Sequence, residues 1–424
     1  MNVPALRFPE FDEDWQTTKL AKLVDKKRKI TYGIVQPGEF VDEGVFLVRG
    51  GDYSNGWSPR EAFKKVTAEI DRPYRRSKLK AGDLLITIVG ANTGNVATVP
   101  DWLEDANITQ TTARIAVERT IAAPQFIEKI LGSRKGQKEV YKYIKGAAQP
   151  GLNLSDLEKF QLTVPSLPEQ KKIAAFLGVV DAKIAALRDR VAGLERYKRG
   201  LMQALFSQTL RFTKPDGTPF PDWEEKRLGD VFGWGKTNSL SRENLNYEGG
   251  EAQNIHYGDI HTKFRATFRQ SQERVPFVSV GAIPNGFADV EFCQIGDVVI
   301  ADASEDYADI GKAIEVVELA ETPLVAGLHT YIARPKGGLA LGFSGYLLRS
   351  ASMRQQIMRI AQGISVLGVS KTNLEKLILN LPHPDEQAKI AEALSAMDTK
   401  IDAVTEQLER MQDFKKGLLQ QMFV

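Results

Sequence analysis

Two stretches of the chain carry apolar residues at heptad spacing. In the first, the apolar positions are Ile173, Leu177, Val180, Ile184, Leu187, Val191, Leu194, Leu201 and Leu205. In the second, they are Ile390, Leu394, Met397, Ile401, Val404, Leu408, Met411, Leu418 and Met422. Alternating steps of four and three residues keep one seam of a helix facing a partner helix. The pattern therefore predicts two long amphipathic helices that pair as a coiled coil, each opened by prolines.

The two helical stretches are copies of one another. Residues 146–206 align without a gap on residues 363–423 at a constant offset of 217, with 22 identities in 61 positions. Both apolar seams are interrupted at the same place, by Lys198 and by Lys415. A repeat at a fixed offset indicates that one structural unit occurs twice. The chain is therefore predicted to contain an internal duplication.

The segments ahead of the two helices correspond more weakly. Trp15 follows an aspartate as Trp223 does, and Gly82-Asp83 and Gly296-Asp297 each precede a β-branched apolar run. A Gly-Asp pair before such a run predicts a turn that leads into a buried strand. We therefore expect an α+β fold with two globular modules, two long helices and a pseudo-two-fold internal repeat. The expected boundaries are 1–165 and 213–382 for the modules, and 166–212 and 383–424 for the helical regions.

Composition excludes several classes of protein. No apolar run approaches the roughly 20 residues that a membrane span requires. Cys293 is the only cysteine, so the chain has no disulfide framework and a reducing cytoplasm is the expected location. His256 and His261 could be read as a metal pair, but no cysteine cluster supports them, and polar residues of a strand or loop are the favoured interpretation. No Asn-Pro-Pro-aromatic or Asp-Pro-Pro-Tyr stretch holds a target amine for methyl transfer, so no catalytic site is predicted.

Charge is distributed unevenly along the chain. The net charge is only +2, but residues 1–206 hold 33 Lys and Arg against 25 Asp and Glu, a balance of +8. Residues 207–424 hold 23 against 29, a balance of −6. A local basic patch can supply the electrostatics of nucleic-acid binding at low net charge. The distribution is therefore compatible with a DNA-binding protein that works within a larger assembly.

The first module contains the strongest candidate DNA contacts. Clustered cations suit phosphates, and neighbouring polar or aromatic side chains can approach bases. An amide-bearing turn after the strand that starts at Leu84 could read adenine edges. The candidate residues are Lys26, Lys27, Arg28, Lys29, Thr31, Tyr32, Arg75, Arg76, Asn92 and Thr93. The alternative interpretation of each group is a solvated loop.

The second module offers fewer cations. Lys263 and Arg265 form its basic side, next to Tyr257. Ser304 and Tyr307 lie in an acidic turn at the position that Asn92 holds in the first module, where a carboxylate could accept from a cytosine amine. That turn either reads bases or lies away from DNA. The long helices themselves, which carry Asp181 and Asp398 at matching positions, are expected to bind partner subunits rather than DNA.

The layout resembles the specificity subunits of type I restriction-modification systems over essentially the whole chain. The residues that carry the resemblance are Leu157-Glu158-Lys159, Pro165 to Ala174, Leu381-Pro382 to Gln387, Thr31 to Gly38 and Tyr257 to Ile260. The resemblance implies two target-recognition domains held apart by antiparallel helices, which read the two halves of a bipartite, asymmetric site in double-stranded DNA. A helix of about 38 residues runs roughly 57 Å, or about 17 bp of DNA.

The resemblance also implies partners and cofactors. The expected partners are two methyltransferase subunits, which methylate adenine N6 with S-adenosylmethionine, and two ATP-driven restriction subunits. S-adenosylmethionine, ATP and Mg²⁺ would belong to those subunits, and no cofactor is expected in this chain. Two alternatives are a coiled-coil interaction scaffold without DNA contact and an enzyme with an unrecognised site. Salt-sensitive DNA binding would exclude the first, and a lack of turnover by the purified chain would exclude the second.

Overall fold

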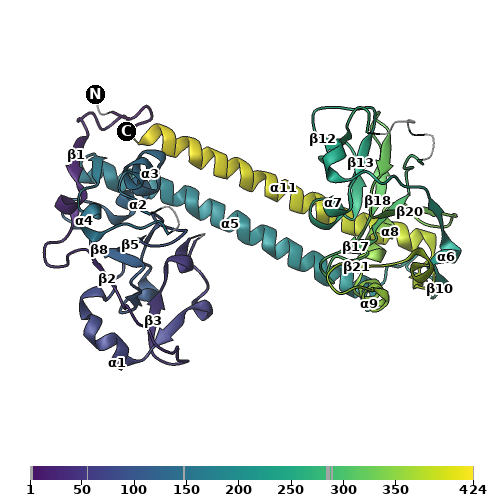
Figure 1. The fold of residues 1–424 in the computed structure, drawn as a ribbon, viewed down its shortest axis with the longest axis horizontal. Coiled ribbons are helices and arrows are strands. Elements are labelled where there is room, and N and C mark those ends of the chain that lie inside the picture. Colours follow the sequence, from purple (N-terminus) through teal and green to yellow (C-terminus); the bar gives the residue numbers. More distant parts are fainter. Residues whose placement is uncertain (1–2, 55, 147–148, 283–286, 288–289, 424) are drawn as a thin grey trace. The chain divides into compact units, whose positions relative to one another are not determined.

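The computed structural model describes residues 3–54, 56–146, 149–282, 287 and 290–423. The chain divides into two compact units, which we call unit 1 (residues 1–188 and 406–424) and unit 2 (residues 189–405). The two long predicted helices are confirmed as α5 (Leu167–Phe206) and α11 (Pro384–Met422), each a continuous helix (Figure 1). Each unit therefore contains the first part of one long helix and the last part of the other. No helix in the described residues is long and apolar enough to cross a membrane.

Unit 1 is built from short antiparallel and mixed sheets and small helices around the beginning of α5. Its four-stranded sheet has the order β2-β8-β5-β6, and its three-stranded sheet has the order β4-β3-β7. A separate pair, β1 with β9, leads into α5. The elements are β1 (Gln16–Lys19), β2 (Thr31–Tyr32), β3 (Val45–Val48), β4 (Lys64–Val66), α1 (Ala68–Asp71), β5 (Leu84–Thr87), β6 (Val96–Thr98), β7 (Asn107–Ile108), β8 (Thr112–Ile115), α2 (Pro124–Gly132), α3 (Arg134–Tyr141), α4 (Leu154–Leu157) and β9 (Gln161–Val164).

Unit 2 repeats this plan with longer strands. Its main sheet has the order β11-β20-β16-β18-β14, a second sheet has the order β12-β15-β13-β19, and β10 pairs with β22 ahead of α11. The elements are β10 (Glu224–Arg227), α6 (Leu228–Val231), β11 (Phe232–Gly235), β12 (Leu245–Asn246), β13 (Gln253–Ile255), α7 (Tyr257–Thr262), β14 (Thr267–Arg269), β15 (Phe277–Val278), β16 (Val298–Ala301), β17 (Ala303–Ser304), β18 (Ala313–Glu318), β19 (Leu324–Ala326), β20 (Thr330–Pro335), α8 (Phe343–Leu348), α9 (Ala351–Ile360), β21 (Leu367–Gly368), α10 (Lys371–Leu374) and β22 (Ile378–Leu381).

The two Gly-Asp turns lead into buried strands, as the sequence predicts. All four residues of β5, which follows Asp83, are buried, and so are all four residues of β16, which follows Asp297. The two aspartates cap their turns in the same way, because each carboxylate accepts the backbone N–H of the residue three positions earlier at 2.8 Å. The sequence match therefore marks structurally equivalent strands.

Matched ion pairs join the two long helices inside each unit. In unit 1, Lys415 Nζ lies 2.6 Å from Asp181 Oδ1. In unit 2, Lys198 Nζ lies 2.5 Å from Asp398 Oδ1. Both residues of one pair lie 217 positions from residues of the other, so the two pairs are related by the repeat. A polar pair within an apolar seam favours one register and orientation of the helices. The lysines that interrupt the seams therefore fix an antiparallel register, and the aspartates are engaged inside the units.

The same two aspartates also bind the globular part of each unit. Lys129, on α2, lies 2.7 Å from Asp181. In unit 2, the hydroxyl of Tyr346, on α8, donates to Asp398 at 2.6 Å. Positions 129 and 346 again differ by 217. Each aspartate thus connects the globular part of its unit with both long helices.

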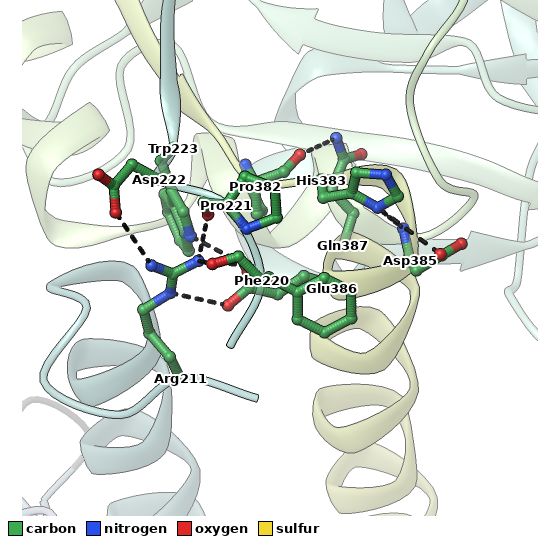
Figure 2. Close-up of polar contacts among 10 residues, drawn as sticks. All are labelled: Arg211, Phe220, Pro221, Asp222, Trp223, Pro382, His383, Asp385, Glu386 and Gln387. Atoms are coloured by element: carbon green, nitrogen blue, oxygen red, sulfur yellow. Dashed lines mark hydrogen bonds and ion pairs between the residues drawn. The ribbon is translucent and has the colours of Figure 1, made fainter. Parts of the chain in front are cut away.

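A buried glutamate fastens the start of each long helix to its module. In unit 2, Glu386 is fully buried, and Arg211 donates to its two carboxylate oxygens from Nε at 3.1 Å and from Nη2 at 2.9 Å (Figure 2). Trp223 Nε1 donates to the same carboxylate at 3.3 Å. Arg211 also donates to the carbonyl oxygens of Phe220 and Pro221, which hold the chain that leads into β10. We call this arrangement the glutamate clasp.

Unit 1 contains the equivalent clasp. Arg7 donates to both carboxylate oxygens of Glu169 at 2.8 Å, and Trp15 Nε1 donates to it at 3.3 Å. The glutamines that follow the glutamates are used alike. Gln170 accepts from the backbone N–H of Ala123, and Gln387 accepts from that of Ala340. The Glu-Gln pair that is identical in the two copies therefore has a structural role, because both side chains make hydrogen bonds within their own unit.

An aromatic residue at or just after the end of each long helix packs against a tryptophan of the unit in which that helix ends. Phe423, at the end of the chain, packs edge-on against Trp15 in unit 1, with ring centroids 6.5 Å apart. Phe206, at the end of α5, packs edge-on against Trp223 in unit 2 at 6.4 Å. The apolar core of each unit thus includes residues from both long helices. Burial of these seams, rather than helix propensity alone, stabilises the helices.

Candidate nucleic-acid interface

A buried arginine brings two basic turns together in unit 1. Arg114 lies on β8 and is only 2% exposed. Its guanidinium donates to the carbonyl oxygens of Lys29 and Arg76, each at 3.0 Å, and to that of Arg28 at 3.4 Å. The turn that contains Lys26 to Lys29 therefore lies beside the helical turn that contains Arg75 and Arg76. The sequence placed these groups about 50 residues apart and gave no reason to join them.

The cations on these two turns are available for binding. Lys26, Lys27, Lys29, Arg72, Arg75 and Arg76 are all exposed, and we call them the cationic face. None of their side chains makes an ion pair or hydrogen bond to any described residue. Tyr32, on the edge strand β2, borders this face and is 47% exposed. A face of this kind presents six positive charges and one aromatic ring to a ligand.

Other candidates of the first module have internal roles. Arg28 forms a bidentate ion pair with Asp83, with Nη1 to Oδ1 at 2.7 Å and Nη2 to Oδ2 at 2.6 Å. The Thr93 hydroxyl donates to the carbonyl oxygens of Gly90 and Pro150. Asn92 is half-buried, and Thr31 is half-buried on β2. Their contact with DNA stays a prediction.

The candidates of the second module are mostly engaged within unit 2. Lys263 Nζ lies 2.8 Å from Asp259 Oδ1, and Arg265 pairs with Asp402 of α11. Ser304 is buried, and its hydroxyl accepts from the N–H of Asp306 at 3.0 Å. Tyr307 is 53% exposed and remains free to approach a base edge. Contact of these four residues with DNA stays a prediction.

Tyr257 belongs to a cluster of aromatic rings. It stacks on His256 with ring centroids 4.6 Å apart, and it meets His261 and His329 edge-on. His256 caps α7, since its Nδ1 accepts the N–H of Gly258 at 3.1 Å. Among the described residues, no group of three or more His, Cys, Asp or Glu is arranged to hold a metal ion. The two histidines of the suggested metal pair therefore serve as a helix cap and an aromatic neighbour.

Titration of His256 is expected to make unit 2 less stable in mild acid. Burial, with the neighbouring Arg242 guanidinium, lowers the pKa of His256 from 6.5 to about 4. Between pH 6.5 and about pH 4, this histidine is protonated in the unfolded chain but neutral in the folded unit. The free energy of unfolding therefore falls as the pH is lowered through this range, by at most about 1.4 kcal/mol per pH unit. Asparagine caps helices without titrating. Urea unfolding of the wild type and His256→Asn at several pH values should show a steeper loss in the wild type; parallel curves would contradict this.

Comparison with known proteins identifies the family. The sequence matches the type I restriction modification DNA specificity domain twice, over residues 12–196 and 221–412. The two matches together cover most of the chain. The chain belongs to this family. Its internal repeat is thus a repeat of the family's domain, as the resemblance implied.

Individual relatives agree with this assignment. The specificity subunit of the type I restriction enzyme EcoBI from Escherichia coli is 32% identical over 199 residues, which cover 47% of this chain and 42% of that subunit. The MjaX specificity-subunit sequence of Methanocaldococcus jannaschii is 22% identical over 97% of this chain and 93% of its own length. The type I S subunit from M. genitalium has the same fold, with a TM-score of 0.58 at 15% identity, and the match covers 100% of this chain and 99% of that one.

Proposed function

We propose that this chain is the DNA-specificity subunit of a type I restriction-modification complex. Each unit reads one half of a bipartite, asymmetric DNA site, and the chain has no catalytic activity of its own. The observation that carries this proposal is the coincidence of two family domains with two compact units, each built around its own glutamate clasp. The match to the E. coli relative covers only 42% of that subunit. The activity of the whole assembly is therefore part of the proposal, and it is inferred from the two copies of the family domain in this chain.

The partners follow from this role. We propose that two methyltransferase subunits and two restriction subunits assemble with the chain in the cytoplasm. S-adenosylmethionine, ATP and Mg²⁺ would bind to those subunits. Within this chain, the cationic face contacts phosphates of the duplex, because exposed and unpaired cations release counterions when they bind DNA. The exposed rings of Tyr32 and Tyr307 are the side chains that we expect to approach base edges.

Salt dependence separates this function from a scaffold without DNA contact. We would purify the chain with the methyltransferase encoded beside it and measure its affinity for a duplex over a range of NaCl concentrations. A specificity subunit should bind duplex DNA with an affinity that falls linearly on a logarithmic salt scale. A stable protein complex with no affinity for duplex DNA at low salt would favour the scaffold.

Helix length is expected to set the unread spacer between the two half-sites. Both long helices start in one unit and end in the other, so removing residues from their middle shortens the connection between the units. Deleting residues 186–192 and 404–410 leaves all four residues of the two interhelical ion pairs in place. Seven residues of helix correspond to about 10 Å, or about 3 bp. Methylome sequencing should show a spacer about 3 bp shorter with both half-sites unchanged; an unchanged spacer would contradict the role.

A further inference from the structure

Strand register reveals an insertion in unit 1 that unit 2 lacks. In unit 1, Val24 bridges to Val117 and Thr31 pairs with Arg114, and six residues lie between them. In unit 2, Phe232 pairs with Pro335 and Gly235 with Ile332, and only two residues lie between them. Positions 117 and 335 are equivalent because β8 pairs with β5 as β20 pairs with β16. Unit 1 therefore carries four extra residues at this point of the sheet.

The four extra residues fall within the lysine-rich turn. It spans residues 25–30, and it contains Lys26, Lys27, Arg28 and Lys29. In unit 2 the chain continues straight through Gly233 and Trp234 within β11. Four of the six residues of this turn are cations, and Ile30 at its end is buried in the core of unit 1. At this point of the sheet, the two copies of the domain therefore differ in charge as well as in length.

The base of the insertion has its own support. The position of Arg114 in β8 corresponds to Ile332 in β20, since Thr31 pairs with the first and Gly235 with the second. Ile332 is fully buried and packs in an apolar cluster. Arg114 is equally buried, but it donates to three carbonyl oxygens, two on the inserted turn and one on the neighbouring turn. Burial lowers the pKa of Arg114, so this support is obtained against a desolvation cost.

Several cations on the globular part of unit 2 are held in ion pairs. Ion pairs engage Arg242, Lys263, Arg265, Arg269, Lys312 and Arg334. In contrast, the six residues of the cationic face make no such pair within the described chain. A paired cation contributes little to counterion release, because its charge is already compensated. The lysine-rich turn therefore gives unit 1 a group of unpaired cations at a point of the sheet where unit 2 has no equivalent turn.

We propose that the cationic face of unit 1 is a phosphate clamp for duplex DNA, and that it supplies most of the salt dependence of binding by the whole chain. Unit 2, which lacks the lysine-rich turn, contributes the smaller share of that salt dependence. The clamp rests on the proposed function, because it requires duplex DNA as the ligand. The clamp adds to the proposed function that phosphate contacts contribute more to the binding of one half-site than to the binding of the other.

The test removes the same amount of charge from each unit. One variant carries Lys26→Gln, Lys27→Gln and Lys29→Gln. The control carries Arg227→Gln, Lys236→Gln and Arg359→Gln, which are exposed cations of unit 2 that pair with no described residue. Each chain is purified with its methyltransferase, and its affinity for a fluorescent duplex without the target motif is measured against NaCl concentration. In parallel, cellular DNA is sequenced for N6-methyladenine.

The clamp predicts a specific difference between the variants. Loss of three phosphate contacts should reduce the slope of log affinity against log salt by about 2.7, while the control should stay near the wild-type slope. Equal slope changes in the two variants, or no change in either, would overturn the clamp. If the wild type and both variants then still methylate one bipartite motif, the proposed function stands and only the clamp fails. A wild type that neither binds duplex DNA nor directs methylation would overturn both.

Discussion

Replacing Glu386 with alanine is expected to lower the free energy of unfolding of unit 2 by about 3 kcal/mol. The carboxylate is fully buried and accepts hydrogen bonds from Arg211 and from the indole of Trp223. Its removal leaves the guanidinium, which is 23% exposed, without its main partner, and leaves the indole N–H unpaired. Both groups also hold the segment that enters β10. Urea unfolding, with hydrogen exchange to report on unit 2, measures the loss.

The first turn of α11 supplies a matched control. Asp385 is adjacent to Glu386, but its side chain is 77% exposed and lies 3.6 Å from His383 (Figure 2). Asp385→Ala should cost less than about 1 kcal/mol, since exposed ion pairs contribute little. Glu386→Gln keeps the shape and one acceptor, and it should fall between the two alanine variants. Equal effects of Glu386→Ala and Asp385→Ala would show that the clasp does not stabilise the unit.

Replacing Arg114 with methionine should destabilise unit 1 by about 3 kcal/mol, because it removes the charged donor for three carbonyl oxygens. The two basic turns should then separate, so duplex affinity should fall even though no exposed charge is lost. Hydrogen exchange at residues 25–32 and 72–78 would report the loosening directly. In this variant, the loss of the Arg114 hydrogen bonds lowers both the stability of unit 1 and its affinity for the duplex.

Arg119 is the control for this substitution. It is exposed and donates to a single carbonyl oxygen, that of Ala81. Arg119→Met removes the same charge and should change stability by less than about 1 kcal/mol. A similar loss in both variants would mean that Arg114 acts only through net charge, and it would remove the structural basis of the paired turns.

The long helices and the duplication were predictable from sequence because their signals are local and repeated. The heptad spacing and the constant offset identify α5 and α11, and the shared interruption at Lys198 and Lys415 was visible as a defect. Its cause was not visible, since each lysine pairs with an aspartate on the other helix. The repeat did point to the partners of the lysines, because Asp181 and Asp398 match at the same offset of 217.

The candidate interface was only partly predictable. The lysine-rich turn was found because four cations in succession are a strong local signal. Arg114 was missed, although an arginine inside the apolar strand β8 is unusual, because its partners lie up to 86 residues away. The engagement of Arg265 by Asp402 depends equally on tertiary structure. Sequence reports which cations exist, whereas the fold decides which of them remain unpaired.

The central claim is that this chain directs methylation to one bipartite DNA site. The most direct measurement is to co-express it with the neighbouring methyltransferase and map N6-methyladenine across the host genome, with and without the chain. The account predicts one bipartite, asymmetric motif that appears only when the chain is present. A stable complex of the two proteins that produces no new methylation would contradict it.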